Sequence, residues 1–328
     1  MYLESAGDLM ETKSYAAFVK DETILLNSSS GGMFTALSEI ILEEGNFIVC
    51  PTYNGNSDQV EYAMIFDKEE RDKCRGSKYI QSIPQDIFKN SEEYLLHNPG
   101  KMALFFGTGC QAAGFVSFME MKKLRHRVIV VDIVCHGAPS PKIWRDYIAT
   151  IKNGSEASIE QISFRDKRTG WESSSSYAKI EDKEVSLFRY KKYLYGPMTL
   201  RHSCYKCPFA TVNRVTDITI GDFWGIKESY PEIYNPNGVS VVLVHTKLGL
   251  DLFEQSKNLL HWIETDIKNS LQPNLVHPTS KSPLREMFMK DYVTYGIEYI
   301  LKKYADDTWK GKIRRKMLLA RSRFHKRW

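Results

Sequence analysis

Hydrophobic and polar residues alternate in blocks along residues 30–153, and the blocks predict helices and strands in turn. In the first block apolar residues recur at helical spacing, at Met33, Phe34, Leu37, Ile40 and Ile41. Near-continuous apolar runs, typical of buried strands, follow in the segments NFIVCP, VEYAMIF, KMALFFG and RVIVVDIVC. Further helices are predicted in PQDIFKNSEEYLLHN, CQAAGFVSFMEMKKL and SPKIWRDYIATIKNG. This alternation predicts an α/β fold with a mixed, largely parallel sheet flanked by helices.

The remainder of the chain is patterned less regularly. We expect a flexible N-terminus at residues 1–14, followed by a strand in YAAFVK. Residues 155–230 are irregular and carry two cysteines, and GVSVVLVHTKLGLDLFEQSKN then returns to a strand and a helix. The sequence thus predicts an α/β domain over residues 15–265, with a candidate internal boundary near residue 150, and a helical C-terminal region over residues 266–328.

Composition narrows the class of protein. With 42% hydrophobic and 26% charged residues, the chain reads as a soluble globular protein. Apolar runs stay shorter than the roughly 18 residues that a membrane-spanning helix needs. The first residues show no basic stretch followed by an apolar run, so we expect no secretory signal and a cytoplasmic location.

Charge is concentrated at the C-terminal end. Residues 310–328 contain nine Lys and Arg and no Asp or Glu, although the net charge of the chain is only +5. Apolar residues recur among them at helical spacing, at Ile313, Met317, Ala320, Phe324 and Trp328. A basic amphipathic helix of this kind can lie on the anionic inner face of a membrane, bind a partner protein or pack on its own domain, and all three stay open. The mildly acidic remainder predicts no nucleic-acid partner.

Six cysteines supply the candidate chemistry. Disulfides are disfavoured in a reducing cytosol, so cysteines spread along a cytoplasmic chain favour metal or redox roles. Cys204 and Cys207 form a CxxC pair followed by Pro208, a spacing found in zinc and iron-sulfur sites. Cys110 and Cys135 follow predicted strands, whose carboxyl ends are where ligands gather in α/β sheets. An iron-sulfur cluster, a zinc ion and independent buried thiols all remain open for these four cysteines.

Two other readings of the cysteines carry less weight. Cys50 ends an apolar run and is predicted to belong to the core. A nucleophile at Cys135 with His136 as its base has little support, because neighbouring side chains on an extended strand point to opposite faces.

Three short glycine-containing segments suit an anionic or flat ligand. SSSGGMF, at residues 28–34, opens a predicted helix, where free N–H groups attract anions and glycine permits close approach. RGSKY, at residues 75–79, combines two cations, a hydroxyl group and an aromatic ring, and GTGCQ, at residues 107–111, permits close backbone approach. Each segment alone suits an ordinary capped helix or a solvated loop equally well. None is a Rossmann or Walker motif.

Taken in order, these motifs resemble one family: the beta subunit of coenzyme F420 hydrogenase/dehydrogenase, with bacterial relatives often encoded among cell-surface polysaccharide genes. The resemblance covers roughly residues 15–255. Its carriers are SSSGGMF, CRGSKY, GTGCQ, CHGAPSP, FRDKRTGW, CYKCPFA, DITIGDFWG and GVSVVLVHTKLG.

The resemblance implies FAD and a [4Fe-4S] cluster, with electrons passing between them and hydride passing between the flavin and a small-molecule or sugar substrate. It implies four cluster ligands: Cys110, Cys135, Cys204 and Cys207. It implies a flavin side formed by Ser30, Gly31, Gly32, Ser77, Lys78 and Tyr79, with Asp222 shaping the site. Three aromatic residues are candidates either for stacking on the flavin or for the core: Trp171, Phe223 and Trp224.

The sequence departs from the family pattern at two places. Gly109 stands where the family usually has proline, before Cys110. No cysteine precedes Cys50, whereas many relatives begin with a cysteine-rich ferredoxin-like module. We therefore expect a separate electron donor such as a ferredoxin, keep Cys74 as an alternative ligand, and leave use of the deazaflavin coenzyme open.

The sequence as a whole predicts an iron-sulfur flavoprotein oxidoreductase of sugar or surface-polysaccharide metabolism. The alternative is a non-redox, zinc-stabilised binding or assembly protein of the same kind of pathway.

Overall fold

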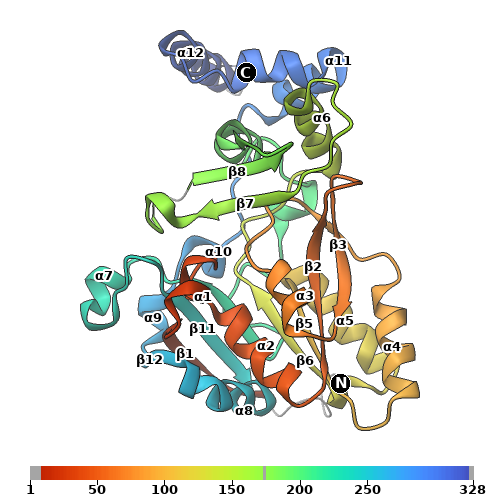
Figure 1. Cartoon of the computed structure of the whole chain (residues 1–328). Coiled ribbons are helices and arrows are strands. Elements are labelled where there is room, and N and C mark those ends of the chain that lie inside the picture. Colours follow the sequence, from red (N-terminus) through yellow and green to blue (C-terminus); the bar gives the residue numbers. More distant parts are fainter. Residues whose placement is uncertain (1–8, 173–174, 325–328) are drawn as a thin grey trace.

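The structure, a computed structural model, describes residues 9–172 and 175–324. Its main feature is a nine-stranded sheet with the strand order β12-β1-β11-β10-β6-β5-β2-β3-β4, in the lower part of Figure 1. The strands are β1 (Leu9–Val19), β2 (Phe47–Asn54), β3 (Gln59–Ile65), β4 (Ser82–Ile83), β5 (Ala103–Thr108), β6 (Val128–Ile133), β10 (Ile218–Asp222), β11 (Ser240–Thr246) and β12 (Leu260–Thr265).

The sheet is parallel at its centre and antiparallel toward one edge. β10, β6, β5 and β2 pair in parallel, whereas β11, β1 and β12 follow as antiparallel strands and β3 runs antiparallel to β2. Parallel strands place all their carboxyl ends at one edge of the sheet, where binding sites form. The predicted α/β class with a mixed, largely parallel sheet is confirmed.

Helices cover both faces of the sheet, as the period-two pattern of its strands requires. In β2, Ile48 and Cys50 face the core shared with α2 (Met33–Glu43) and α8 (Lys247–Ser256). The alternate residues face the core shared with α4 (Ile87–His97) and α5 (Gly109–Met121). Shorter helices lie in the connections: α1 (Glu22–Leu26), α3 (Lys68–Lys73), α7 (Ile226–Ser229), α9 (Ile267–Ser270) and α10 (Pro273–Val276).

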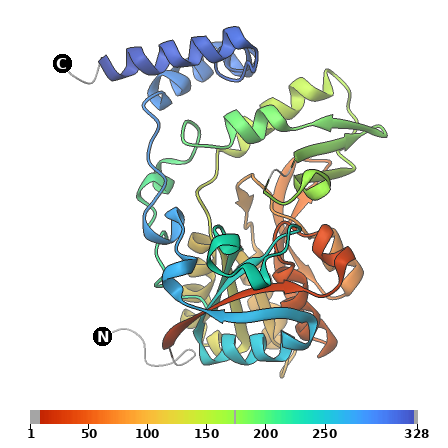
Figure 2. The same ribbon diagram turned by 90° about the vertical axis from the view of Figure 1, so that its left-hand side faces the viewer.

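A second hydrophobic core lies in the upper part of Figures 1 and 2, above the carboxyl edge of the main sheet. It joins α6 (Pro141–Lys152) and α11 (Arg285–Tyr304) to an antiparallel sheet of β7 (Gln161–Asp166), β8 (Ser175–Ile180) and β9 (Lys183–Ser186). Trp144, Tyr190, Phe288 and Tyr304 are fully buried in it. Residues 155–186, whose sequence pattern is irregular, thus contain a small sheet.

The N-terminal strand is longer than the sequence predicted. β1 begins at Leu9 and pairs with both β11 and β12, so residues 9–14 belong to the sheet rather than to a flexible segment. Alternate apolar residues are few in LMETKS, which hides the strand from its pattern. Residues 1–8 of the predicted N-terminus lie outside the described residues.

The basic tail forms α12 (Trp309–Phe324), which lies beside α11 at the top of Figure 2. Leu318 packs on the second core, and Arg315 donates to the Tyr193 hydroxyl at 3.0 Å. Trp309, Ile313 and Met317, four residues apart, are exposed. The Phe324 side chain and Trp328, predicted on the same apolar stripe, lie outside the described residues. Within the part described, we find no helix of the length and apolarity needed to cross a membrane.

Candidate functional site

A cavity of about 480 Å³ lies at the carboxyl ends of β5, β6 and β10, a volume in the range of small-molecule and cofactor sites. Loops at residues 28–34 and 74–82 form one part of its lining, and residues 201–210 and 272–279 contribute another. Ten of the eleven residues that the family resemblance implies for the cluster and the flavin line it: Ser30, Gly32, Ser77, Lys78, Tyr79, Cys110, Cys135, Cys204, Cys207 and Asp222.

The four cysteines reach this cavity from three separate segments. β5 and β6 are parallel neighbours, so Cys110, in the first turn of α5, and Cys135, just after β6, lie at adjacent strand ends. Cys204 lies in a 3-10 helix (His202–Lys206), and Cys207 follows it directly. Gly137 lets this turn approach, because a Cβ atom there would lie 3.0 Å from the Cys204 Cβ, at a φ of +120°.

The thiols lie near enough to one another to affect the pKa values of two of them. Burial raises the pKa of Cys135 to about 12, and nearby Cys110, Cys204 and Cys207 also raise it. The hydrogen bond from the Gly137 N–H lowers this pKa in part. That N–H lies 3.3 Å from the Cys135 Sγ. The pKa of Cys207 is raised chiefly by burial, and also by Cys110 and Cys204. Bringing four thiolates together here therefore needs a positive centre, which is what a metal cluster supplies.

The four sulfurs share one cavity without closing on one point. Among the described residues, no group of three or more His, Cys, Asp or Glu side chains is close enough to hold a single metal ion. Around one zinc ion four thiolates must all lie about 2.3 Å from the same atom. In an iron-sulfur cluster each thiolate binds a different iron atom, which spreads the ligands around a larger core.

The serine-glycine loop contributes a helix terminus to the cavity. Gly32, with a φ of +86°, precedes α2 and lines the cavity. Gly31 does not line it: a Cβ atom there would lie 2.3 Å from the Ala17 carbonyl oxygen and 2.7 Å from the Ser240 nitrogen. The structure thus brings Gly32 to the site and uses Gly31 for contact with β1 and β11.

The loop that carries Ser77 is tied to the serine-glycine loop. The Ser77 N–H donates to the Ser29 hydroxyl at 2.7 Å, and the Ser30 hydroxyl donates to the Val239 carbonyl oxygen at 3.1 Å. These bonds place Ser30 and Ser77 on neighbouring parts of the cavity wall.

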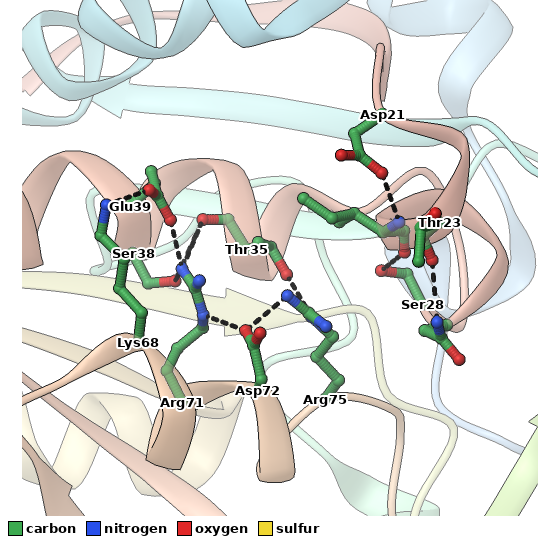
Figure 3. A network of polar contacts seen from close by, with 12 residues as sticks. Asp21, Thr23, Ser28, Thr35, Ser38, Glu39, Lys68, Arg71, Asp72 and Arg75 are labelled. Atoms are coloured by element: carbon green, nitrogen blue, oxygen red, sulfur yellow. Dashed lines mark hydrogen bonds and ion pairs between the residues drawn. The ribbon is translucent and has the colours of Figure 1, made fainter.

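A polar network shown in Figure 3 fixes α3, and with it the start of the second loop, against α2. The Arg71 side chain is buried, and its Nη1 contacts Glu39 at 2.8 Å and the Ser38 hydroxyl at 3.3 Å. Arg75 donates from Nε to the Thr35 hydroxyl at 3.0 Å and also pairs with Asp72. Arg75 is therefore bound within the protein, although it lines the cavity.

Lys78 and Tyr79 complete this wall. The Lys78 ammonium group donates to the carbonyl oxygen of Cys74, which folds the loop back on itself. The Tyr79 ring stacks on Tyr195 with centroids 4.3 Å apart, and the His136 ring meets Tyr195 edge-on at 4.4 Å. Burial lowers the pKa of His136. Aromatic side chains thus close the cavity beneath the second core.

Asp222 joins two of the sequence motifs. Its carboxylate accepts from Arg165 at 2.6 Å and from the Trp171 indole N–H at 2.9 Å, so FRDKRTGW meets GDFWG at the end of β10. Trp224 stacks on Trp171 with centroids 5.1 Å apart and lines the cavity. Trp171 and Phe223 are buried in a core cluster.

Sequence reasoning missed Arg214, which lines the cavity beside the cysteines. Its Nη1 lies 2.7 Å from an Asp132 carboxylate oxygen, and both side chains are buried. A Cβ atom on Gly109 would already lie 2.6 Å from this nitrogen. The structure thus explains why a bulky residue before Cys110 does not suit this chain. The sequence signal for this pair is Asp132, a single aspartate in the apolar run VIVVDIV, because a buried carboxylate needs a cationic partner.

Comparison with known proteins identifies one family, matched in two parts, and finds similar folds among solved structures. The family described as coenzyme F420 hydrogenase/dehydrogenase, beta subunit, matches through its N-terminal part at residues 14–85 and its C-terminal part at residues 100–267. A chain of the F420-reducing [NiFe] hydrogenase complex from Methanosarcina barkeri, solved after xenon derivatization, is similar with 18% identity and a TM-score of 0.53. The likeness covers 90% of this chain and 97% of that chain, and shows the fold alone. No curated protein matches.

Proposed function

Because the chain belongs to the coenzyme F420 hydrogenase/dehydrogenase beta-subunit family, we propose that it is an iron-sulfur flavoprotein oxidoreductase. In this proposal a [4Fe-4S] cluster and FAD share the cavity, and electrons pass between them and a soluble substrate. The observation that carries the proposal is the meeting of Cys110, Cys135, Cys204 and Cys207 at a cavity that two glycine-containing loops also line.

The spacing of the thiols supports a cluster over zinc. A single zinc ion needs tightly grouped ligands, and no such group of three occurs among the described side chains. Burial is the largest cause of the raised pKa values of Cys135 and Cys207, and Cys110 and Cys204 raise both values further, which supports one site for the four cysteines. A polynuclear core fits both facts, with the Gly137 N–H as a hydrogen-bond donor to the Cys135 sulfur.

Fit to the flavin rests on the residues of the lining that do not include the four cysteines. Gly32 opens α2 into the cavity, where free N–H groups favour a phosphate, and Ser30 and Ser77 stand beside it. Lys78, Tyr79 and Asp222 would complete the wall, and the exposed ring of Trp224 offers a flat surface. When bound, FAD supplies a carrier that takes up two electrons together and releases them singly.

Substrate and partners follow from the same proposal. We assign the electron supply to a separate donor such as a ferredoxin, and the substrate to small molecules or sugars of surface-polysaccharide metabolism. The stripe of Trp309, Ile313 and Met317 on a basic helix suits a cytoplasmic protein that rests on the inner membrane face.

The proposal is tested by purifying the full chain anaerobically, recording its visible spectrum and assaying iron, sulfide, zinc and flavin. We expect flavin bands, a broad shoulder that bleaches on reduction, and about four iron atoms per chain. A colourless protein that contains zinc, before and after anaerobic reconstitution with iron, sulfide and FAD, would instead establish the zinc-stabilised alternative.

A further inference from the structure

Thr108 is the last residue of β5 and the N-cap of α5, two residues before Cys110. A threonine at an N-cap usually accepts a hydrogen bond from an N–H group in the first turn of the helix. Among the described residues, the Thr108 side chain makes no such capping bond. Its hydroxyl group instead lies 3.0 Å from Gln111 Oε1 and 3.4 Å from Cys110 Sγ. Helix capping therefore does not account for this side chain.

The orientation of the Gln111 amide group is fixed by a carbonyl group. Gln111 Nε2 donates to the Ser82 carbonyl oxygen at 2.9 Å. A carbonyl oxygen can only accept, so the NH₂ group of the amide must lie on this side and Oε1 on the other. Three hydroxyl groups converge on Oε1, from Tyr62 at 3.1 Å, Ser82 at 2.9 Å and Thr108 at 3.0 Å. The amide oxygen is thus surrounded by donors.

Three hydroxyl groups compete for this oxygen. An amide oxygen offers two lone pairs, so two of the three donors satisfy it. Among the hydrogen bonds of the described residues, Thr108 is the only one of the three that also reaches a sulfur atom, Cys110 Sγ. The Thr108 hydroxyl group is therefore the donor that can turn from the amide to the sulfur while Tyr62 and Ser82 still satisfy Gln111.

The direction of the Thr108–Cys110 hydrogen bond follows from the state of the sulfur. A cysteine that binds a metal is a thiolate, which has no proton to donate, so the hydroxyl group must be the donor. Hydrogen bonds to charged acceptors are shorter and stronger than those between neutral groups. A charged Cys110 sulfur therefore draws the Thr108 proton away from the Gln111 oxygen.

This hydrogen bond can be removed without removing the turn. The Gln111 side chain holds the turn through Ser82 and Tyr62 whether or not Thr108 carries a hydroxyl group. The other donor to a cysteine sulfur at the site is the Gly137 N–H, which belongs to the main chain and stays in every variant. Thr108 is therefore the side chain through which the surroundings of a ligand sulfur can be changed.

We propose that Thr108 sets the reduction potential of the cluster through the hydrogen bond from its hydroxyl group to the Cys110 sulfur. This inference rests on the proposed function, because it needs a cluster bound at Cys110. A cluster that takes up one electron from its donor gains one negative charge, and no proton has to move. A hydrogen bond to a ligand sulfur stabilises the more negative, reduced form and so raises the potential.

The test is a redox titration of the full-length protein, reconstituted anaerobically with iron, sulfide and FAD and followed by the electron paramagnetic resonance of the reduced cluster. Thr108→Val removes the hydroxyl group with little change of shape, whereas Thr108→Ser keeps it. At the potential that half-reduces the wild-type cluster, we expect the ratio of reduced to oxidised cluster to fall about tenfold in Thr108→Val, a shift of about 59 mV for one electron. Thr108→Ser should titrate close to wild type.

The same titration separates this inference from the proposed function. Equal potentials in wild type and Thr108→Val, at equal iron content, would overturn the inference and leave the proposed function intact. If wild type binds no iron, the proposed function fails and the inference with it. If Thr108→Val loses iron, Thr108→Ala takes its place with the same expected shift. If both of these variants fold but lose iron, the hydroxyl group retains the cluster rather than setting its potential, which also overturns the inference.

Discussion

Asp132 and Arg214 form a buried ion pair, 2.7 Å long, directly beneath the turn that carries Cys110. The same carboxylate accepts from the Thr216 hydroxyl at 3.2 Å and from the Thr219 hydroxyl at 2.5 Å. Burial raises the pKa of Asp132, and Arg214 and the hydroxyl groups oppose that shift. A charged pair thus supports the floor of the candidate site.

We predict that Asp132→Asn destabilises the protein by about 3–5 kcal/mol, because it leaves the Arg214 guanidinium buried without a counter-charge. Urea unfolding measures the change. Asp182→Asn removes a partner from the exposed Lys179 ion pair and should leave the free energy of unfolding nearly unchanged. Pairing Asp132→Asn with Arg214→Met should recover part of the loss. If Asp132→Asn and Asp182→Asn were equally stable, the assigned role of Asp132 would be refuted.

His245 predicts a pH dependence of stability. Its ring lies 2.9 Å from the Thr219 hydroxyl and 3.1 Å from the Thr12 hydroxyl, and burial lowers its pKa to about 3. The unfolded chain, with a histidine pKa near 6.5, binds this proton more readily, so stability is lost as the pH falls from about 6.5 toward 3.

The free energy of unfolding should therefore fall by up to about 1.4 kcal/mol per pH unit on this account. Urea unfolding between pH 7 and pH 5 should show a smaller slope for His245→Gln than for wild type. Replacing the exposed His97 with glutamine is the matched control and should leave the slope unchanged. A His245→Gln slope equal to that of wild type would contradict the prediction.

Gly31 and Gly196 form a matched pair of glycines. Gly31→Ala would drive a methyl group into the backbone of Ala17 and Ser240, whereas no atom lies within 4 Å of a Cβ atom at Gly196. We expect Gly31→Ala to lower the unfolding free energy by about 1–3 kcal/mol and Gly196→Ala to leave it nearly unchanged. Thermal unfolding followed by circular dichroism distinguishes them. A stable Gly31→Ala that fails only in flavin binding would return Gly31 to the cofactor site.

The exposed stripe of α12 predicts binding to anionic membranes. Wild type should sediment with vesicles of phosphatidylglycerol and phosphatidylcholine, and added salt should weaken that binding. The double variant Ile313→Ser and Met317→Ser should lose most of it, because both side chains face solvent. Val293→Ser, at an exposed apolar position on α11, is the control. If the double variant bound the vesicles as well as wild type does, the exposed stripe of α12 would not be the membrane-binding surface.

The local sequence pattern predicted the strands correctly where both faces of a strand are buried. The apolar runs around Val130 and Phe105 predicted parallel strands, and the rule that sites form at their carboxyl ends placed Cys110 and Cys135 together. The CxxC spacing identified Cys204 and Cys207, but no local signal says that their turn folds over those strand ends. That contact depends on Gly137, whose lack of a side chain matters only in three dimensions.

Other features depend on partners that are remote in the chain. The sequence predicts Gly31 to be a phosphate-loop residue because a glycine before a helix has the same local pattern whether it faces a ligand or another strand. Leu9 to Ser14 belong to a strand because Leu9, Lys13 and Ser14 pair with β11, and Ser14 also pairs with β12, which composition alone does not reveal. Arg214 reaches the site through its buried partner, 82 residues away in sequence.

The most direct test of a shared cluster is the iron content of single cysteine variants, each reconstituted anaerobically. We predict about four iron atoms per chain in wild type and in Cys74→Ser, and a loss of more than half in Cys110→Ser, Cys135→Ser, Cys204→Ser and Cys207→Ser. Iron content in all four of those variants equal to that of Cys74→Ser, with the protein folded, would contradict the cluster and with it the redox account.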